Sequence, residues 1–565
     1  MMGPTMRTSI SLILFPVILF LSTAVQAQDS QAAAPTLGDL ARQHRAQKAA
    51  GADNAPAAST ASGSLGEIAR TNRENQPVEV KITEKDSRAL FGAMGAVLDF
   101  ASQDTGLPKH SSVKYQLVSQ ADVTKRFTEG LSENSAAQAL AREELVLKKF
   151  GYLPPSFDFK KSMISHLGKS IEGYYDNRNK TMHLVNWVDL EQQLPIMAHE
   201  LTHALQDQNY DLFKWRSSHQ RSEAAKTSVD FADSEESSGR TSVVEGQAMV
   251  VYMDYLLRPV GHSLAEAMEN RPELMDTIRA RIESSIYDTS MVLHGAPLLI
   301  KESTIFPYRE GLLFEMALLR RGGKNMAFAG AFARPPWDTH EILEPEAYLS
   351  QRKRPVVVLP DLKAALAGRY AAYDSGTMGQ LDVRILAQQY GTENDVDTIT
   401  PAWQGGAFVA VRRAEAAEPV ASTADLALLY VSRWKTQEAA KRFAEVYKKS
   451  LPKRVKIQSE DASGASACTA NCPQWSARVN TDEGPVLLEI WPNNTLLIAQ
   501  SFDDETMSRL RPAVLTAAPA AAAKATASDL SLRLYKLPEF QALQTEVRAE
   551  IMKSLEQLIP KTAAR

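Results

Sequence analysis

The chain has 565 residues, a formal net charge of −4 at pH 7 and a hydrophobic fraction of 44%. That length allows roughly two to four domains. The nearly balanced charge gives no reason to propose a nucleic acid or an anionic membrane surface as a partner. Composition alone does not predict the oligomeric state.

The first residues are typical of a secretory signal peptide. Ile10–Leu21 is an apolar run that is too short for a comfortable membrane span, and Ala24–Ala27 offers a small-residue cleavage site. We expect cleavage after Ala27, or alternatively after Ala24, and we keep an uncleaved anchor as a further alternative. Residues 1–27 are therefore predicted to be removed, leaving a periplasmic or secreted protein with no stable membrane span. Residues 28–76 are rich in Ala, Ser, Asn and Gln, which predicts a disordered linker.

Residues 77–350 are predicted to form a mainly helical domain. Ile171–Asn186 predicts two short strands joined by a turn at Asp176–Asn179. An edge strand here could pair with an extended peptide through main-chain hydrogen bonds, or could be plain scaffold. Helical apolar spacing recurs in several segments: Ala89–Ser102, Ala136–Phe150, Val243–Leu257 and Gly311–Leu319.

One motif in this domain points to metal chemistry, the HExxH sequence His199-Glu200-Leu201-Thr202-His203. The apolar spacing around it predicts a helix, with Pro195 expected in the first turn. Residues four apart share a helix face, so His199 and His203 could ligate one Zn²⁺. Glu200 would then act as general base on a water bound to the zinc. The alternative is two exposed helix histidines beside an acid.

A catalytic zinc site needs a third protein ligand, and Glu245 is the best candidate. It lies in an apolar helical run, where a buried carboxylate needs a metal or hydrogen-bond partner. The alternative is a surface carboxylate. Gly246 permits the close approach of another helix. Three other acids lie in polar, Ser-rich sequence and are expected to be solvated: Glu223, Glu235 and Glu236.

Supporting roles around the metal are harder to assign. Asp207 follows His203 by one helical turn, and could accept a hydrogen bond from a ligand histidine, hold a neighbouring loop, or be an ordinary exposed acid. Tyr308 and Arg309, just before an apolar helical run at Leu312–Leu319, are our candidates for a catalytic donor that stabilises the oxyanion. Further candidates, each more often a packing or surface residue, are His219, His262 and His294.

The segment His199–Asp207 closely resembles the active-site helix of thermolysin-like gluzincins. Together with Gly173–Asp176 and Val244–Ala248, it is similar to a group of poorly characterised prokaryotic zinc metallopeptidases. The likeness covers about Ala101–Tyr348 and includes Phe306–Gly311 and Arg334–Pro345.

The resemblance implies zinc ligation by His199, His203 and Glu245, and base catalysis by Glu200. The chain departs from the thermolysin pattern at Met249, where that pattern has an Asp, and in its longer insert before Glu245.

A smaller α+β domain is predicted over residues 351–514. Trp403–Gly406 is expected to be a turn, Pro492–Asn494 a hairpin turn, and Thr436 the cap of a helix that continues through Tyr447. Strand-like runs are Ala407–Arg412, Leu426–Trp434, Trp475–Val479, Val486–Trp491 and Thr495–Ser501.

The two cysteines of the chain, Cys468 and Cys472, could close a small disulfide loop in an oxidising compartment, or could remain free. Residues 515–565 are predicted to be an Ala-rich linker and an amphipathic helix. The apolar stripe of that helix must dock, by default on its own protein.

The expected fold class is therefore α+β, with a mainly helical zincin-like domain, a short edge sheet and a smaller α+β domain. We expect a zinc-dependent peptidase of the cell envelope that cleaves a peptide or protein substrate. The alternative is an exported zinc-binding scaffold or partner-binding protein without turnover. An intact Glu200 favours the peptidase, because a structural site does not need a base.

Overall fold

The computed structural model describes most of the chain from residue 82 onward. The described residues are 82, 84–119, 121–123, 134–158, 173–188, 190–217, 234–285, 293–351, 357, 359–461, 464–465, 472–516, 528–529 and 538–558. The predicted signal peptide, the linker over 28–76 and Cys468 lie outside them. Among these residues, no helix combines the length and the apolar composition that a membrane crossing requires.

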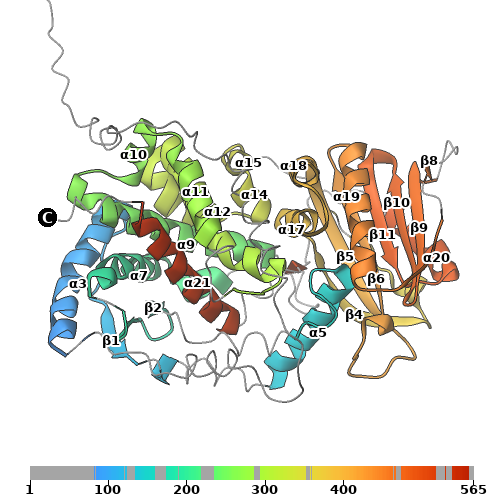
Figure 1. Ribbon diagram of the computed structural model, residues 1–565, viewed down its shortest axis with the longest axis horizontal. Helices are drawn as coiled ribbons and strands as arrows, with labels where there is room; N and C mark the ends of the chain where they lie inside the picture. The colour runs from blue at the N-terminus through green and yellow to red at the C-terminus, as the bar shows by residue number, and fades with distance from the viewer. Residues whose placement is uncertain are drawn as a thin grey trace, which may run out of the picture. The chain divides into compact units, whose positions relative to one another are not determined.

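The described residues from 84 to 349 are mainly helical, as the sequence predicts (Figure 1). The longer helices are α3 (Glu84–Thr105), α5 (Asn134–Phe150), α7 (Leu190–Tyr210), α9 (Ser234–Leu257), α11 (Leu274–Ser284) and α12 (Leu298–Lys324). Short helices are α8 (Leu212–Ser217), α10 (Leu264–Asn270), α13 (Ala331–Ala333), α14 (Thr339–Leu343) and α15 (Pro345–Leu349).

A three-stranded sheet accompanies these helices. It consists of β1 (Lys114–Val118), β2 (Gly173–Asp176) and β3 (Thr181–Val185) in the order β1-β3-β2. β2 and β3 form the predicted antiparallel pair, and β1, which the sequence analysis did not predict, runs parallel to β3. β2 is therefore an edge strand of this sheet, and it packs beside α7.

A second, larger sheet follows. Its strands are β4 (Tyr370–Thr377), β5 (Trp403–Arg413), β6 (Leu426–Trp434), β7 (Ile457–Glu460), β8 (Gly464–Ala465), β9 (Trp475–Thr481), β10 (Gly484–Trp491), β11 (Thr495–Gln500) and β12 (Ser528–Asp529). The order is β12-β4-β5-β6-β11-β10-β9-β7, with β8 paired to β9. The pairs are antiparallel except β12 with β4. The fold class is α+β.

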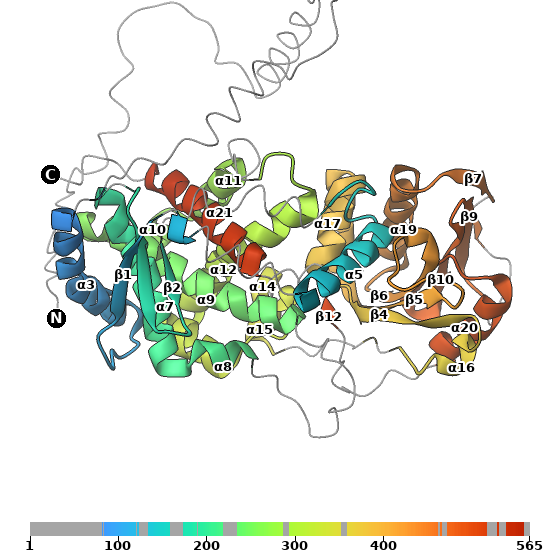
Figure 2. The same cartoon turned by 90° about the horizontal axis from the view of Figure 1, so that it is seen from below.

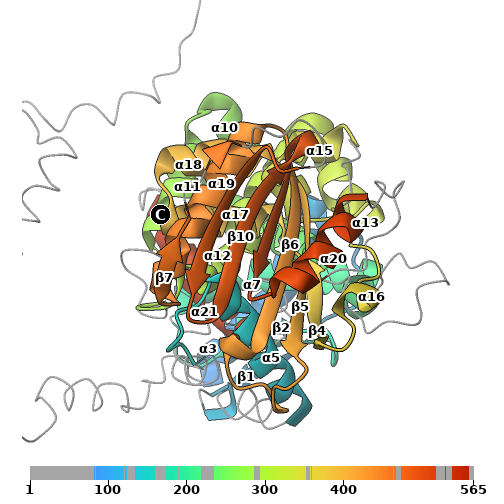
Figure 3. The same cartoon turned by 90° about the vertical axis from the view of Figure 1, so that its right-hand side faces the viewer.

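Helices cover both faces of the large sheet because its strands bury alternate side chains on each face. Along β6, Leu428 and Tyr430 join one apolar cluster, while Leu429 and Val431 join the other. The first face packs against α17 (Gln380–Tyr390) and α19 (Gln437–Ser450). The second packs against α16 (Lys363–Leu366) and α20 (Asp504–Thr516), and Figure 3 looks onto these strands with α20 lying across them. α18 (Glu393–Ile399) contacts α17 and α19.

Two of the three local predictions for this region agree with the structure. The Thr436 side chain accepts a hydrogen bond from the Ala439 amide at the start of α19, which satisfies one free amide of the first turn. Pro492–Asn494 joins β10 to β11. Trp403–Gly406, however, is the first part of β5 and not a turn. A Cβ on Gly406 would lie 2.5 Å from the Tyr430 hydroxyl, so this glycine serves close packing.

The chain ends in α21 (Pro538–Glu556), which docks on its own protein through the predicted apolar stripe. It contacts α11 and α12, as Figure 2 shows, and Leu543, Val547, Ile551 and Leu555 are buried. Burial of each such side chain stabilises the folded protein by about 1.5–3 kcal/mol. The four side chains together therefore contribute on the order of 10 kcal/mol to the docking of α21. α21 is therefore a firmly packed element of the fold.

Candidate metal centre

The candidate metal ligands come from two helices that pack against each other, α7 and α9. α7 extends from Leu190, so Pro195 lies inside the helix and not in its first turn as expected. α9 in turn approaches α12 very closely. A Cβ added to Gly246 would lie 2.3 Å from the Gly311 carbonyl oxygen, and one on Gly311 would lie 2.4 Å from the Ser242 carbonyl oxygen. Only glycines allow this approach, which fixes the position of Glu245.

The three predicted ligands converge on one point. The Nε2 atoms of His199 and His203 are 3.1 Å apart, and Glu245 Oε2 lies 3.3 Å from each of them. The histidines are buried, and the Glu245 side chain is 13% exposed. Neither Glu245 Oε2 nor His199 Nδ1 has a hydrogen-bond partner. Two imidazoles and a carboxylate around one point are a donor set that suits Zn²⁺ and leaves a coordination position for water or substrate.

Electrostatics favour the ligand form of His199 and of Glu245. Burial lowers the pKa of His199 to about 4, and Arg548 adds to this effect, so the imidazole stays neutral as a metal ligand must. Burial opposes the charged form of Glu245, but His203 and His199 outweigh burial and hold the pKa of that carboxyl well below its usual range. For His203, burial also opposes the charged form, and the Glu245 carboxylate outweighs it and raises the pKa.

Gln206 orients His203. His203 Nδ1 donates to Gln206 Oε1 at 2.9 Å, which leaves Nε2 facing the cluster. The Gln206 amide donates in turn to Gln247 Oε1 at 2.9 Å and to the Val244 carbonyl at 3.1 Å, so the same side chain ties α7 to α9. Proteins commonly orient a metal-ligating histidine by a hydrogen bond from the ring nitrogen that does not bind the metal.

Asp207 does not provide this support. Its carboxylate accepts hydrogen bonds from the Tyr175 hydroxyl at 2.8 Å, Lys180 Nζ at 2.6 Å and the Leu212 amide at 2.9 Å. Asp207 therefore fixes the β2–β3 hairpin and the start of α8. Of the roles that the sequence analysis left open for Asp207, this is the one in which it holds a neighbouring loop. The reason is geometric: Gln206 faces the His203 Nδ1 atom, and Asp207 faces the hairpin.

The candidate base, Glu200, is buried and lies beside a cation that the sequence analysis did not identify. Arg548 Nη1 of α21 is 2.6 Å from Glu200 Oε1, and the two side chains are 4% and 1% exposed. Arg548 Nη2 also donates to the Gly173 carbonyl of β2 at 2.7 Å. The guanidinium therefore bridges α7 and the edge strand β2.

Tyr308 belongs to the surroundings of the cluster. It is buried in α12, and burial, together with the charges of Glu245 and Glu200, raises its pKa well above the usual value. Its hydroxyl is therefore a neutral donor. Arg216 of α8 is a second unpredicted cation, with Nη2 3.8 Å from Glu245 Oε1.

Several other candidates are not at the cluster. Arg309 lies in a separate ionic network with Glu302 and Glu310, at 2.9 and 3.0 Å. His262 is exposed beside Glu266, His294 is exposed, and His219 and Glu223 lie outside the described residues.

Two acids expected to be solvated have partners instead. Glu235 is buried and accepts hydrogen bonds from the Thr339 amide and hydroxyl, because α9 begins earlier than the apolar pattern indicates. Glu236 pairs with Arg240.

The missed residues left only weak signals in the sequence. Gln544 and Arg548 stand four residues apart, among the apolar positions of the last helix, and both are buried. Polar residues on a docking face need partners, which is the signal that could have identified Arg548. Its partner, Glu200, lies far away in the sequence, so no local pattern could have paired them.

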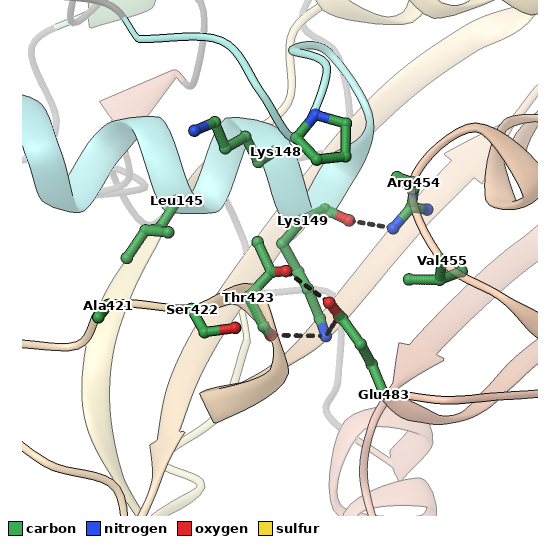
Figure 4. A pocket seen from close by; sticks show the side chains of 10 residues that line it. Leu145, Lys148, Lys149, Ala421, Ser422, Thr423, Arg454, Val455 and Glu483 are labelled. Carbon is green, nitrogen blue, oxygen red and sulfur yellow. Dashed lines mark hydrogen bonds and ion pairs between the residues drawn. The ribbon is translucent and has the colours of Figure 1, made fainter.

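A cavity of about 210 Å³ lies elsewhere, between α5 and loops that connect elements of the large-sheet region (Figure 4). Burial lowers the pKa of Lys149 there to about 8, although Glu483 opposes the shift. Lys149 Nζ contacts Glu483, the Thr423 carbonyl and the Ser501 hydroxyl at 2.7, 2.9 and 2.9 Å. An ammonium has three donors, so these contacts satisfy it and explain its burial by structure alone.

Comparisons of the chain with protein-family models, with curated proteins and with solved structures gave no match. Cys472 is disulfide-bonded, and its predicted partner Cys468 lies outside the described residues.

Proposed function

We propose that the protein is an exported zinc-dependent peptidase, with the ion held by His199, His203 and Glu245. The observation that carries the proposal is the convergence of two buried histidines and the half-buried Glu245 on one point, with Glu200 of the same motif beside them. A purely structural zinc site uses four protein ligands and needs no base, whereas this cluster offers three ligands and an adjacent carboxylate.

When bound, the zinc ion would polarise water and the substrate carbonyl and would stabilise the developing negative charge. Glu200 accepts the proton of the attacking water and later delivers it to the leaving amine. Tyr308 offers a neutral hydroxyl donor from α12 near the same place. The buried surroundings exclude bulk water and strengthen these interactions.

The edge strand β2 suits an extended peptide as substrate. It ends the three-stranded sheet on one side and packs beside α7, and a Cβ on Gly173 would lie 3.3 Å from Ile196 Cγ2. Edge strands bind peptides by adding a strand through main-chain hydrogen bonds. The resemblance of His199–Asp207 to the gluzincin helix supports peptide hydrolysis, and with it a zincin-like helical domain. The N-terminal apolar run supports export.

The test is the Glu200→Gln variant. Glutamine is nearly the same size but cannot accept the proton, so turnover of a peptide identified by library digestion should fall at least about 10²–10⁴-fold. Zinc content and the unfolding temperature should stay near those of the parent. Glu269→Gln, on an exposed position of α10, is the matched control and should keep full activity.

Full turnover by zinc-loaded Glu200→Gln would overturn the assignment of the base. A parent protein that binds zinc and cleaves no peptide in a broad library would favour the non-catalytic zinc scaffold instead.

A further inference from the structure

The C-terminal helix places a cation at the candidate base. We propose that Arg548 is a catalytic residue of this site, and that its guanidinium stabilises the negative charge that passes from Glu200 to the carbonyl oxygen of the substrate. The inference rests on the proposed function, because it assigns a role within the same reaction. It names the donor that the HExxH motif leaves undetermined.

Arg548 is a fixed part of the site. Its Nη1 atom lies 2.6 Å from Glu200 Oε1, and its Nη2 atom donates to the Gly173 carbonyl at 2.7 Å. α21 is held beyond these bonds: the Tyr252 hydroxyl donates to the Met552 carbonyl at 3.0 Å, and Arg281 Nε donates to the Ser554 carbonyl at 3.2 Å. A helix anchored at several points presents the guanidinium in one position, as preorganised catalysis requires.

The Arg548 guanidinium lies between strand β2 and helix α7, the two elements that a bound peptide would contact in the proposed function. Gly173 belongs to the edge strand where we expect the substrate backbone, and Glu200 belongs to the helix that carries the candidate ligands. Arg548 touches both, so it lies between the base and the strand where the substrate backbone is expected. No other described arginine contacts Glu200.

The charge balance of the step explains why a cation belongs there. The attacking water gives one proton to Glu200, its oxygen forms a bond to the carbonyl carbon, and the π pair of the carbonyl bond moves to the carbonyl oxygen. Glu200 changes from −1 to neutral while the carbonyl oxygen changes from neutral to −1. Arg548 therefore loses one anionic partner and gains another nearby. An interaction that follows the migrating charge favours the transition state.

The other nearby donors fit this role less well. Arg216 approaches the ligand Glu245 at 3.8 Å, and its side chain is 33% exposed. Tyr308 is a neutral donor, and its pKa, raised well above the usual value by burial and nearby carboxylates, excludes an anionic form. Arg548 alone combines full charge, burial and direct contact with the base.

The first experiment compares the parent with Arg548→Met and Arg548→Lys on a fluorogenic peptide chosen by library digestion. We expect Arg548→Met to lower kcat about 10²–10³-fold, the loss typical of one oxyanion donor. KM and zinc content should change little, and Arg548→Lys should restore part of kcat. Arg281→Met, which removes another anchor of α21, is the control and should leave kcat near the parent's value.

An increase of turnover in Arg548→Met would overturn the proposal, because it would show that α21 covers and inhibits the site. Unchanged kcat in a folded, zinc-loaded Arg548→Met protein would overturn it as well. If the rise in activity also occurred in Arg281→Met, the docking of α21 would be the controlling feature.

The second experiment does not depend on turnover. Glu200→Ala leaves space for a small carboxylate beside Arg548, so sodium formate should raise the unfolding temperature of Glu200→Ala more than equal sodium chloride does. The parent and the double variant Glu200→Ala/Arg548→Met should show no such difference. Equal formate effects in Glu200→Ala and the double variant would show that Arg548 does not bind an anion there. A positive formate result without peptide cleavage by the parent would leave Arg548 as an anion-binding residue and reject the proposed function.

Discussion

Two groups of buried charge in the molecule differ in how their members are paired. In the first, which we call the arginine network, Glu302 contacts Arg309 and Arg384 at 2.9 and 3.1 Å, and Glu310 contacts the same two arginines at 3.0 Å. Burial opposes the charge of Glu310, yet Arg309, Arg384 and Arg279 outweigh it and lower its pKa to about 2.

The candidate metal cluster of His199, His203 and Glu245 is paired differently. Its ligand atoms point toward one another around a common point, and Glu245 Oε2 has no hydrogen-bond partner. Both groups are buried and both are charged, so burial of charge alone does not mark a functional site. What distinguishes the cluster from the arginine network is that three possible ligand atoms, from two histidines and a carboxylate, lie close together around one point.

The largest effect that we expect is a loss of folding stability when the arginine network is disrupted, without a change in zinc binding. Arg309→Met removes one cation from the arginine network and leaves two buried carboxylates short of a partner, which should lower the free energy of unfolding by about 3–5 kcal/mol. Denaturant unfolding measures this loss. Zinc content of the folded fraction should not change, because Arg309 does not contact the cluster.

Arg271→Met is the control for that variant. Arg271 pairs with Glu273 at 3.2 Å on the exposed surface, where ion pairs contribute little. A similar loss of stability in both variants, or a loss of zinc in Arg309→Met alone, would contradict the distinction between the two groups.

A smaller effect, on zinc affinity, is expected when the hydrogen-bond partner of His203 is removed. Gln206→Ala removes the acceptor of the His203 Nδ1 proton, and zinc affinity should fall about 10–100-fold, as for other outer partners of ligand histidines. Competition with a chromogenic chelator measures the affinity. The neighbouring Asp207→Asn is the matched control, because its carboxylate contacts Tyr175, Lys180 and Leu212 instead. A greater loss in Asp207→Asn would return the supporting role to Asp207.

Much of this structure follows from local sequence signals. β6 has the predicted bounds, and the β2–β3 hairpin, the Thr436 cap and the Pro492–Asn494 connection also agree with the structure. Each depends on residues close together in the chain, so propensity and side-chain periodicity suffice. The two histidines and Glu245 were found for a related reason: a fixed motif spacing, and one acid in an otherwise apolar run.

The parts that could not be predicted depend on packing between distant segments. The predicted helical segment Gly311–Leu319 is only the middle of α12, which extends from Leu298 to Lys324 and continues through Pro307. The glycines at Trp403–Gly406 suggest a turn, but the segment is part of β5, and Gly406 allows the close packing of Tyr430. Arg548 meets Glu200 only because the last helix, α21, docks so that this side chain reaches α7, far away in the sequence.

The measurement that tests the central claim most directly is the zinc stoichiometry of purified variants after dialysis against a buffer of fixed free zinc. The account predicts one zinc ion per chain in the parent and in Glu200→Gln. It predicts a large loss in His203→Ala and Glu245→Ala, with folding checked by circular dichroism. Zinc retained equally by the parent and both ligand variants would contradict the assignment of this cluster as the metal centre.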